Sequence, residues 1–207
     1  MSAPSSSLAR LENVLGGHAF FLVNVNVMGG RSTSNLAKSN DGKGSLLFTG
    51  VINTSGGGFA SCRSDDRVQR IVIPDDATRV VLSVRGDSML YKVLLSDGSR
   101  GLQSPSYQHD FEANTANTAN TANTANTANT ATTASTFKEL SLPLSSFLPS
   151  YGGRPSARPL AAPPLMKENV TTVGFMLSLK TSSGEPNPTF KEGSFPFRLE
   201  VRDLRFE

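Results

Sequence analysis

The sequence "FPFRLEVRDLRF", residues 195–206, carries the clearest strand pattern in the chain. Apolar and charged side chains alternate along its first part, so Phe197, Leu199 and Val201 share one face. A period of two residues is typical of a β-strand with one buried face. The alternation slips by one residue before Leu204. The slip predicts a β-bulge near Arg202–Asp203, because one extra residue restores the apolar face.

Similar runs recur along the chain, with glycine, proline and other turn residues between them. We expect strands at about 19–27, 45–52, 57–64, 78–85, 89–95, 106–112, 137–144, 170–180 and 195–206. Helical patterns of about ten residues or more are absent beyond the N-terminal segment. Many short strands joined by turns indicate an all-β domain, either a sandwich or a barrel.

The domain organisation follows from three segments that lack this pattern. Residues 1–18 are Ser-rich and are predicted to be a flexible leader to one domain at 19–207. An Asn-Thr-Ala repeat fills 113–136 and offers no apolar side chain larger than alanine, so it cannot offset its ordering entropy. We interpret it as a disordered hairpin loop, with a binding or glycosylated tract as the alternative. Residues 150–165 are proline-rich and predict an extended connection.

Composition excludes several classes of protein. The net charge is +3 and the basic residues are scattered, which disfavours a nucleic-acid partner. No apolar run approaches the roughly 18 residues that a stable membrane span requires. Cys62 is the single cysteine, so the chain cannot form an intrachain disulfide. Its place in a strand-like run predicts a small core residue rather than a nucleophile.

Catalytic motifs are incomplete. The glycine-rich "GGGFAS" (56–61) and "DGKGS" (41–45) fail the dinucleotide and phosphate-loop patterns. The only two histidines and the cysteine are far apart and predict no zinc site. We therefore expect no enzyme, no cofactor and no metal. A carboxylate pair remains open as a glycosidase alternative, drawn from Asp87, Asp110 and Glu112.

Polar and aromatic residues on the predicted strands favour binding instead, because arginine and tyrosine on a sheet make good recognition surfaces. The candidates are Arg63, Arg85, Tyr91, Tyr107 and Gln108. A glycine turn with Met28, Gly29 and Gly30 leads into two further candidates, Arg31 and Ser32. We expect the three arginines to lie near one surface region with Tyr91. The alternative is that they stabilise turns by pairing with Asp65, Asp66 or Asp87.

An ordered set of segments resembles the complex I intermediate-associated protein family, also called the NADH:ubiquinone oxidoreductase intermediate-associated domain. These are "NVNVMGGRSTSNL", "LLFTGVINTSGGGFASCRS", "VVLSVRGDSMLYKVLL", "YQHDFEA", "FKELSLPLSSFLPSYGGRP", "VGFMLSLK" and "GSFPFRLEVRDLRF". The resemblance spans roughly 20–207 without the repeat. Residues 28–32 match the family's Met-Gly-Gly-Arg-Ser loop. Its Gly-Phe-Ala-Ser-x-Arg strand is matched by Phe59, Ala60, Ser61 and Arg63, and its Arg-Gly-Asp-x-x-x-Tyr hairpin by Arg85, Gly86, Asp87 and Tyr91. Three departures are Asn24-Val25-Asn26 in place of Asn-Asp-Gly, the absence of a tryptophan expected upstream, and Phe137 in place of another tryptophan.

The resemblance implies a galactose-binding-like jelly-roll β-sandwich of two antiparallel sheets without a catalytic centre. It also implies a chaperone or assembly factor for mitochondrial respiratory complex I that contacts protein partners, either complex I subunits or other assembly factors. Two alternatives remain. One is a domain that binds carbohydrate, like a carbohydrate-binding module, although the chain has no tryptophan and three tyrosines. The other is a chloroplast relative that serves photosystem biogenesis; a cytoplasmic location is also open.

Overall fold

The computed structural model describes residues 18–23, 31–40, 42–55, 58–96, 105–113, 136–151, 154–155 and 164–207. The expectations of a flexible leader and of a disordered repeat fall on residues 1–17 and 114–135, outside this description. The described chain is almost entirely strand, and its two helical turns are the short 3-10 helices η3 (Leu144–Ser146) and η5 (Lys167–Asn169). None of the described helices has the length and hydropathy of a membrane span.

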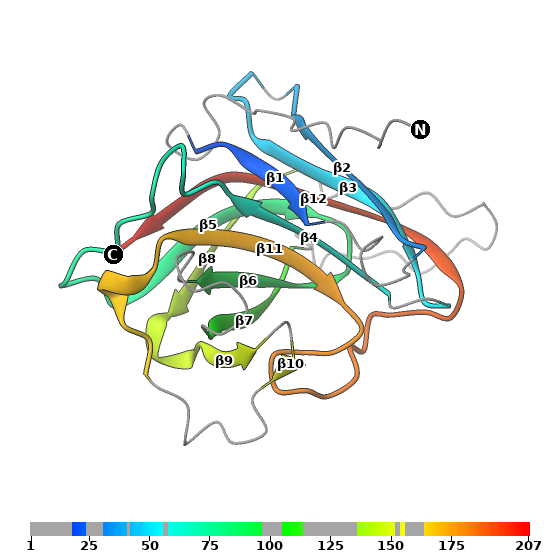
Figure 1. The fold of residues 1–207 in the computed structure, drawn as a ribbon. Coiled ribbons are helices and arrows are strands. Elements are labelled where there is room, and N and C mark those ends of the chain that lie inside the picture. The colour runs from blue at the N-terminus through cyan, green and yellow to red at the C-terminus, as the bar shows by residue number, and fades with distance from the viewer. Residues whose placement is uncertain are drawn as a thin grey trace, which may run out of the picture.

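The strands form two antiparallel sheets that pack face to face (Figure 1). The seven-stranded sheet has the order β1-β4-β11-β6-β7-β9-β10. Its strands are β1 (Phe20–Val23), β4 (Phe59–Ser64), β6 (Leu90–Ser96), β7 (Ser106–Glu112), β9 (Leu148–Tyr151), β10 (Arg154–Pro155) and β11 (Thr172–Ser178). The five-stranded sheet has the order β2-β3-β12-β5-β8. Its strands are β2 (Thr33–Lys38), β3 (Leu46–Asn53), β5 (Arg79–Gly86), β8 (Lys138–Pro143) and β12 (Ser194–Phe206). The predicted β-sandwich is therefore confirmed.

The core lies between the sheets and follows the alternation of the sequence. Phe175 and Leu177 of β11 face Leu199 and Val201 of β12 across the sandwich, and all four side chains are fully buried. The pairing of β12 with β5 shifts register between Val201 and Asp203, which confirms the predicted bulge. Burying apolar surface on both sheets supplies the main stabilisation of such a fold.

Cys62 also lies in this core. It is fully buried, and burial raises the pKa of its thiol to about 12, while a backbone hydrogen bond involving Phe175 opposes the shift. A thiol held in its protonated form is a weak nucleophile, because the thiolate is the reactive species. The expectation of a small core residue is confirmed.

Two expectations about connections were wrong. Strand β7 belongs to the seven-stranded sheet and β8 to the five-stranded sheet, so the segment that contains the repeat joins the two sheets and is not a hairpin loop. The proline-rich stretch 150–165 also contains the end of β9 and all of β10, which pair with each other. Pro155 fits there because β10 is the edge strand, where a missing backbone N–H costs little.

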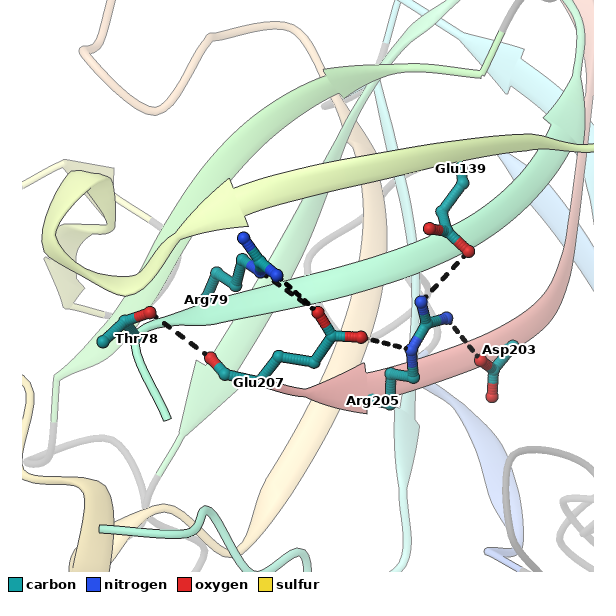
Figure 2. Close-up of polar contacts among 6 residues, drawn as sticks. All are labelled: Thr78, Arg79, Glu139, Asp203, Arg205 and Glu207. Carbon is teal, nitrogen blue, oxygen red and sulfur yellow. Dashed lines mark hydrogen bonds and ion pairs between the residues drawn. The ribbon is translucent and has the colours of Figure 1, made fainter. Parts of the chain in front are cut away.

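The C-terminal end of β12 is fixed by charged side chains (Figure 2). The Arg205 guanidinium contacts Glu139 of β8, as well as Asp203 and Glu207. Arg79 of β5 binds the carboxylate of Glu207 at 2.8 Å, and its backbone N–H donates to the Glu207 carbonyl oxygen at 2.8 Å. The last residue thus belongs to the ladder between β12 and β5.

Candidate binding site

The sandwich separates two of the arginines that were expected together. Arg63 lies on β4 of the seven-stranded sheet, and Arg85 lies on β5 of the five-stranded sheet. Their neighbours Cys62 and Val84 both point into the core between the sheets. Because successive strand residues point to opposite faces, the two arginines project from opposite sides of the molecule. The expectation of one surface region that holds all three arginines was wrong.

The two tyrosine candidates are core residues rather than surface residues. Tyr91 is fully buried, and its hydroxyl donates to Asp87 Oδ1 at 2.8 Å. Burial, followed by the charge of Asp87, raises the pKa of Tyr91 well above its ordinary value. Tyr107 is also buried, and its hydroxyl donates to the Pro164 carbonyl oxygen at 2.9 Å. Both hydroxyls have hydrogen-bond acceptors within the domain. Because both side chains are buried, neither ring is available to a binding protein.

The glycine turn and its neighbours are only partly described. Met28, Gly29 and Gly30 lie outside the described residues. Arg31 is exposed just before β2, where it is accessible to a partner. Ser32 is buried, and its Oγ accepts a hydrogen bond from the backbone N–H of Asn53 at 3.0 Å. Ser32 therefore ties the start of β2 to the end of β3.

Arg85 belongs to an ion cluster on the outward face of the five-stranded sheet. Its guanidinium donates to Glu200 Oε2 at 2.5 Å, and Ser39 Oγ donates to the same oxygen at 2.6 Å. Arg198 donates from Nε and Nη2 to Glu200 Oε1, at 3.1 Å and 2.6 Å. Arg85 is therefore ion-paired, but within the sheet rather than at a turn, because Arg85 of β5 and Glu200 of β12 are register partners. The partner is Glu200 rather than any of the expected aspartates.

A phenylalanine completes this cluster. The guanidinium carbon of Arg85 lies 4.5 Å from the ring centroid of Phe137, and that of Arg202 lies 3.6 Å from it. Such cation–π contacts are favourable because the ring face carries negative charge density. Phe137 therefore supports the arginines at the position where the family resemblance leads one to expect tryptophan.

The outward face of the seven-stranded sheet brings other candidates together. Arg63, Gly174, Leu94 and Gln108 follow one another across β4, β11, β6 and β7 in register. A Cβ at Gly174 would lie 3.0 Å from Arg63 Cγ, so the arginine stem lies against this glycine. The neighbouring row contains a second set of residues on the same face: Ser61, Met176, Lys92 and Asp110.

The charged groups of these two rows are buried or half-buried. Lys92 is only 2% exposed, and its Nζ donates to Gln108 Oε1 at 3.1 Å. Burial lowers the pKa of Lys92, and the charge of Asp110 opposes that shift. Burial also lowers the pKa of Arg63. Asp110 Oδ2 accepts a hydrogen bond from the backbone N–H of Ser182 at 2.8 Å.

Hydrogen bonding on this face is incomplete. Most buried polar atoms in proteins have a partner, so a group of exceptions calls for an explanation. In the described part of the chain, the buried side-chain atoms on this face and at its rim that have no hydrogen-bond partner are Ser61 Oγ, Arg63 Nε, Gln108 Nε2, Asp110 Oδ1, Ser150 Oγ and Ser182 Oγ. We call the group Ser61, Arg63, Lys92, Gln108 and Asp110 the polar face.

The sequence identified only part of the polar face. Arg63 and Gln108 were binding candidates, and Asp110 was considered only as one of a carboxylate pair. Lys92 and Ser61 were missed. The available signal was a lysine inside the otherwise apolar run "LYKVLL" at 90–95. Sequence cannot show that this lysine is buried, because strand alternation alone equally predicts a solvated position.

The structure separates Asp87 from the other two carboxylates of the glycosidase alternative, Asp110 and Glu112, which share one face of β7. Asp87 is buried in the turn after β5, where it accepts hydrogen bonds from the backbone N–H of Arg198 and from Tyr91. Asp110 lies instead on the outward face of the other sheet. Within the described ranges, no group of three or more potential metal ligands is present.

Comparison with known proteins agrees with this architecture. The fold is similar to that of a family 11 carbohydrate-binding module from Clostridium thermocellum, solved in complex with a beta-1,3-1,4-mixed-linked tetrasaccharide. The TM-score is 0.52 at 10% sequence identity, over 86% of this chain and 84% of that chain. The family 11 module of the C. thermocellum cellulosomal cellulase Lic26A-Cel5E has a TM-score of 0.49 at 10% identity, over 99% of this chain and 95% of that one.

At these identities the likeness concerns the fold alone. No curated protein matches the chain. The sequence model of the family described as complex I intermediate-associated protein 30 (CIA30) matches residues 18–201. The match runs from just before β1 to the centre of β12 and so covers nearly the whole sandwich. The chain therefore belongs to the complex I intermediate-associated protein 30 family.

Proposed function

We propose that this chain is a non-enzymatic binding domain that acts as an assembly factor for respiratory complex I (NADH:ubiquinone oxidoreductase) in mitochondria. The observation that carries the proposal is the family match over residues 18–201, because it spans the sandwich rather than one short motif. The partners in this proposal are complex I subunits or other assembly factors, held through protein contacts.

The structure narrows the residues available for such contacts. Arg31 is exposed before β2. On the five-stranded sheet, Arg85 and Arg198 keep part of their side chains exposed, 21% and 36%, while both bind Glu200. Interface arginines are frequently energetic hot spots, because the guanidinium offers several donors in a planar array. Arg31 and Arg198 are the most exposed of these three arginines and are accordingly the partner-binding candidates.

The test is affinity purification of the tagged full chain from cells, followed by mass spectrometry of the captured proteins. We expect complex I subunits or assembly factors to be enriched over a mock purification. The variant Arg31→Gln is expected to lower that enrichment severalfold, while its melting temperature stays close to that of the wild type, because Arg31 is exposed. Recovery of no complex I protein from mitochondria-containing cells would refute the assembly role.

Two further arms address the alternatives. A glycan array with the purified domain tests carbohydrate binding; specific retention on glycans without complex I partners would replace the assembly proposal. A fluorescent fusion of the full chain reports the compartment, and we expect it to coincide with a mitochondrial marker. A plastid signal would favour the photosystem-biogenesis relative instead.

A further inference from the structure

A buried ammonium on the polar face lacks a full set of partners. Lys92 is 2% exposed, and in the described part of the chain its Nζ donates one hydrogen bond, to Gln108 Oε1. An ammonium has three N–H donors and strongly prefers water or an anion. Burying such a charge is costly unless it is paired and hydrogen-bonded. Within the described residues, the hydrogen bond to Gln108 and the charge of Asp110 offset this cost only in part.

The charges around Lys92 do not remove this imbalance. Arg63 adds a second cation to the polar face, and its Nε is buried without a partner. Asp110 supplies one carboxylate, and its Oδ2 is already held by the backbone N–H of Ser182. Glu112 follows on the same face of β7 but is exposed. The described side chains of the polar face thus include two cations and one carboxylate.

The side-chain amide of Gln108 indicates that the missing group is a hydrogen-bond acceptor. Gln108 is fully buried, its Oε1 accepts from Lys92, and its Nε2 has no partner. The amide nitrogen can only donate. An ammonium and an amide N–H₂ on adjacent strands therefore both require an acceptor. A buried water can accept one such bond, but it leaves the charge of Lys92 uncompensated.

We propose that the polar face binds a small oxyanion, a carboxylate or a phosphate, whose oxygens accept hydrogen bonds from Lys92 Nζ and Gln108 Nε2. Charge-assisted hydrogen bonds to an oxyanion are about twice as strong as neutral ones. The ligand is small because both side chains are almost fully buried, which excludes a broad protein surface. The anion is either free in solution or the acidic side chain of a partner inserted at this point. This inference is independent of the assembly role.

The test follows thermal unfolding of the full chain by circular dichroism, in potassium phosphate or potassium acetate against potassium chloride of equal ionic strength. A ligand that binds only the folded state raises the melting temperature with its concentration. We expect phosphate or acetate to raise it above chloride. Lys92→Met and Gln108→Leu are expected to weaken the anion affinity about tenfold or more, the loss of one charge-assisted hydrogen bond. Lys38→Met, at an exposed lysine on β2, is the matched control and should keep the response.

A second measurement needs no variant. The side-chain resonances of Lys92 should shift on titration with phosphate or acetate in nuclear magnetic resonance spectra of the wild type, and not with chloride. The peptides acetyl-Gly-Glu-Gly-amide and acetyl-Gly-Gln-Gly-amide then distinguish the two sources. Tighter binding of the glutamate peptide than of acetate assigns the site to a partner's side chain, and the reverse assigns it to a free anion. Equal melting temperatures in all salts, with no shift at Lys92, would overturn the proposal.

Discussion

Replacement of Glu200 by alanine should destabilise the domain more than any other single change of a charged residue in the five-stranded sheet. The Glu200 side chain is fully buried and accepts hydrogen bonds from Arg85, Arg198 and Ser39. Its backbone lies in β12, the central strand of the sheet. Alanine would leave two guanidinium groups side by side without the anion that separates their charges.

The loss of stability in Glu200→Ala depends on how well water can solvate the two arginines once the carboxylate is removed. Removing one partner of a fully buried ion pair costs about 3–5 kcal/mol. Here the arginine side chains are 21% and 36% exposed, so solvation reduces the cost to about 2–4 kcal/mol. Glu139→Ala is the matched control. Glu139 also pairs with an arginine, Arg205, but is 63% exposed, and exposed pairs contribute about 0–1 kcal/mol (Figure 2).

The pH dependence of the unfolding free energy supplies a second test of whether Glu200 acts as a buried anion. Burial would raise the pKa of Glu200, but hydrogen bonds from Arg85, Ser39 and Arg198 outweigh it, and the pKa lies below the ordinary value of 4.5. A lowered folded-state pKa means that the charged carboxylate stabilises the fold above pH 4.5 and that this contribution is lost as pH falls through the folded-state pKa. The difference between wild type and Glu200→Gln should therefore be largest near neutral pH and shrink in acid.

Urea unfolding followed by circular dichroism, from neutral pH to below pH 4.5, measures both quantities. The other carboxylates are common to the wild type and the variant, so they cancel in the difference. A Glu200→Ala cost below about 1 kcal/mol would contradict the reasoning. So would a Glu200→Gln difference that stays constant as the pH is lowered, because Glu200 would then not act as a buried anion.

Three further predictions concern the core and the repeat. Phe175→Ala should cost about 3–5 kcal/mol in urea unfolding, because the fully buried ring packs 6.2 Å from Phe20 and 6.4 Å from Phe111; a near-neutral result would mean that β11 is placed wrongly. Cys62 should react with a thiol reagent only as fast as the domain unfolds, since burial raises its pKa to about 12; rapid labelling of the folded protein would contradict its core position. Deletion of residues 114–135 should change stability by less than about 1 kcal/mol, and a loss of several kcal/mol would show that the repeat packs on the sandwich.

Much of the fold could be predicted from the sequence, because alternation is a direct consequence of burying one face of a strand. Every run that was expected to be a strand contains one. The missed strands are β2, β9 and β10. The sequence of β2, "TSNLAK", has one large apolar residue, Leu36, and otherwise resembles a polar loop. These strands lie at or next to sheet edges, where backbone pairing rather than apolar alternation decides the structure.

The candidate site was harder to predict, because alternation assigns a residue to a face but not to a sheet. Arg63 and Arg85 occupy similar places near strand ends in the sequence, yet one projects from each side of the molecule. Only the order of strands, set by pairings between segments far apart in the chain, separates them. The same pairings bring Lys92 next to Gln108 and Arg85 next to Glu200.

The outward faces of the two sheets differ in how completely their buried charged groups are hydrogen-bonded, and this difference bears on function. On the five-stranded sheet, the buried carboxylate of Glu200 is surrounded by donors from three other side chains. On the seven-stranded sheet, the ammonium of Lys92 donates one hydrogen bond within the described residues, to a neutral amide, and several nearby buried polar atoms have no partner there. A fully paired cluster stabilises and orients strands, whereas an incompletely paired one lowers stability and is retained where a ligand completes it. On this reasoning, Lys92→Met should leave the domain at least as stable as the wild type while removing its response to anions. Glu200→Ala should lower the stability and keep the response to anions.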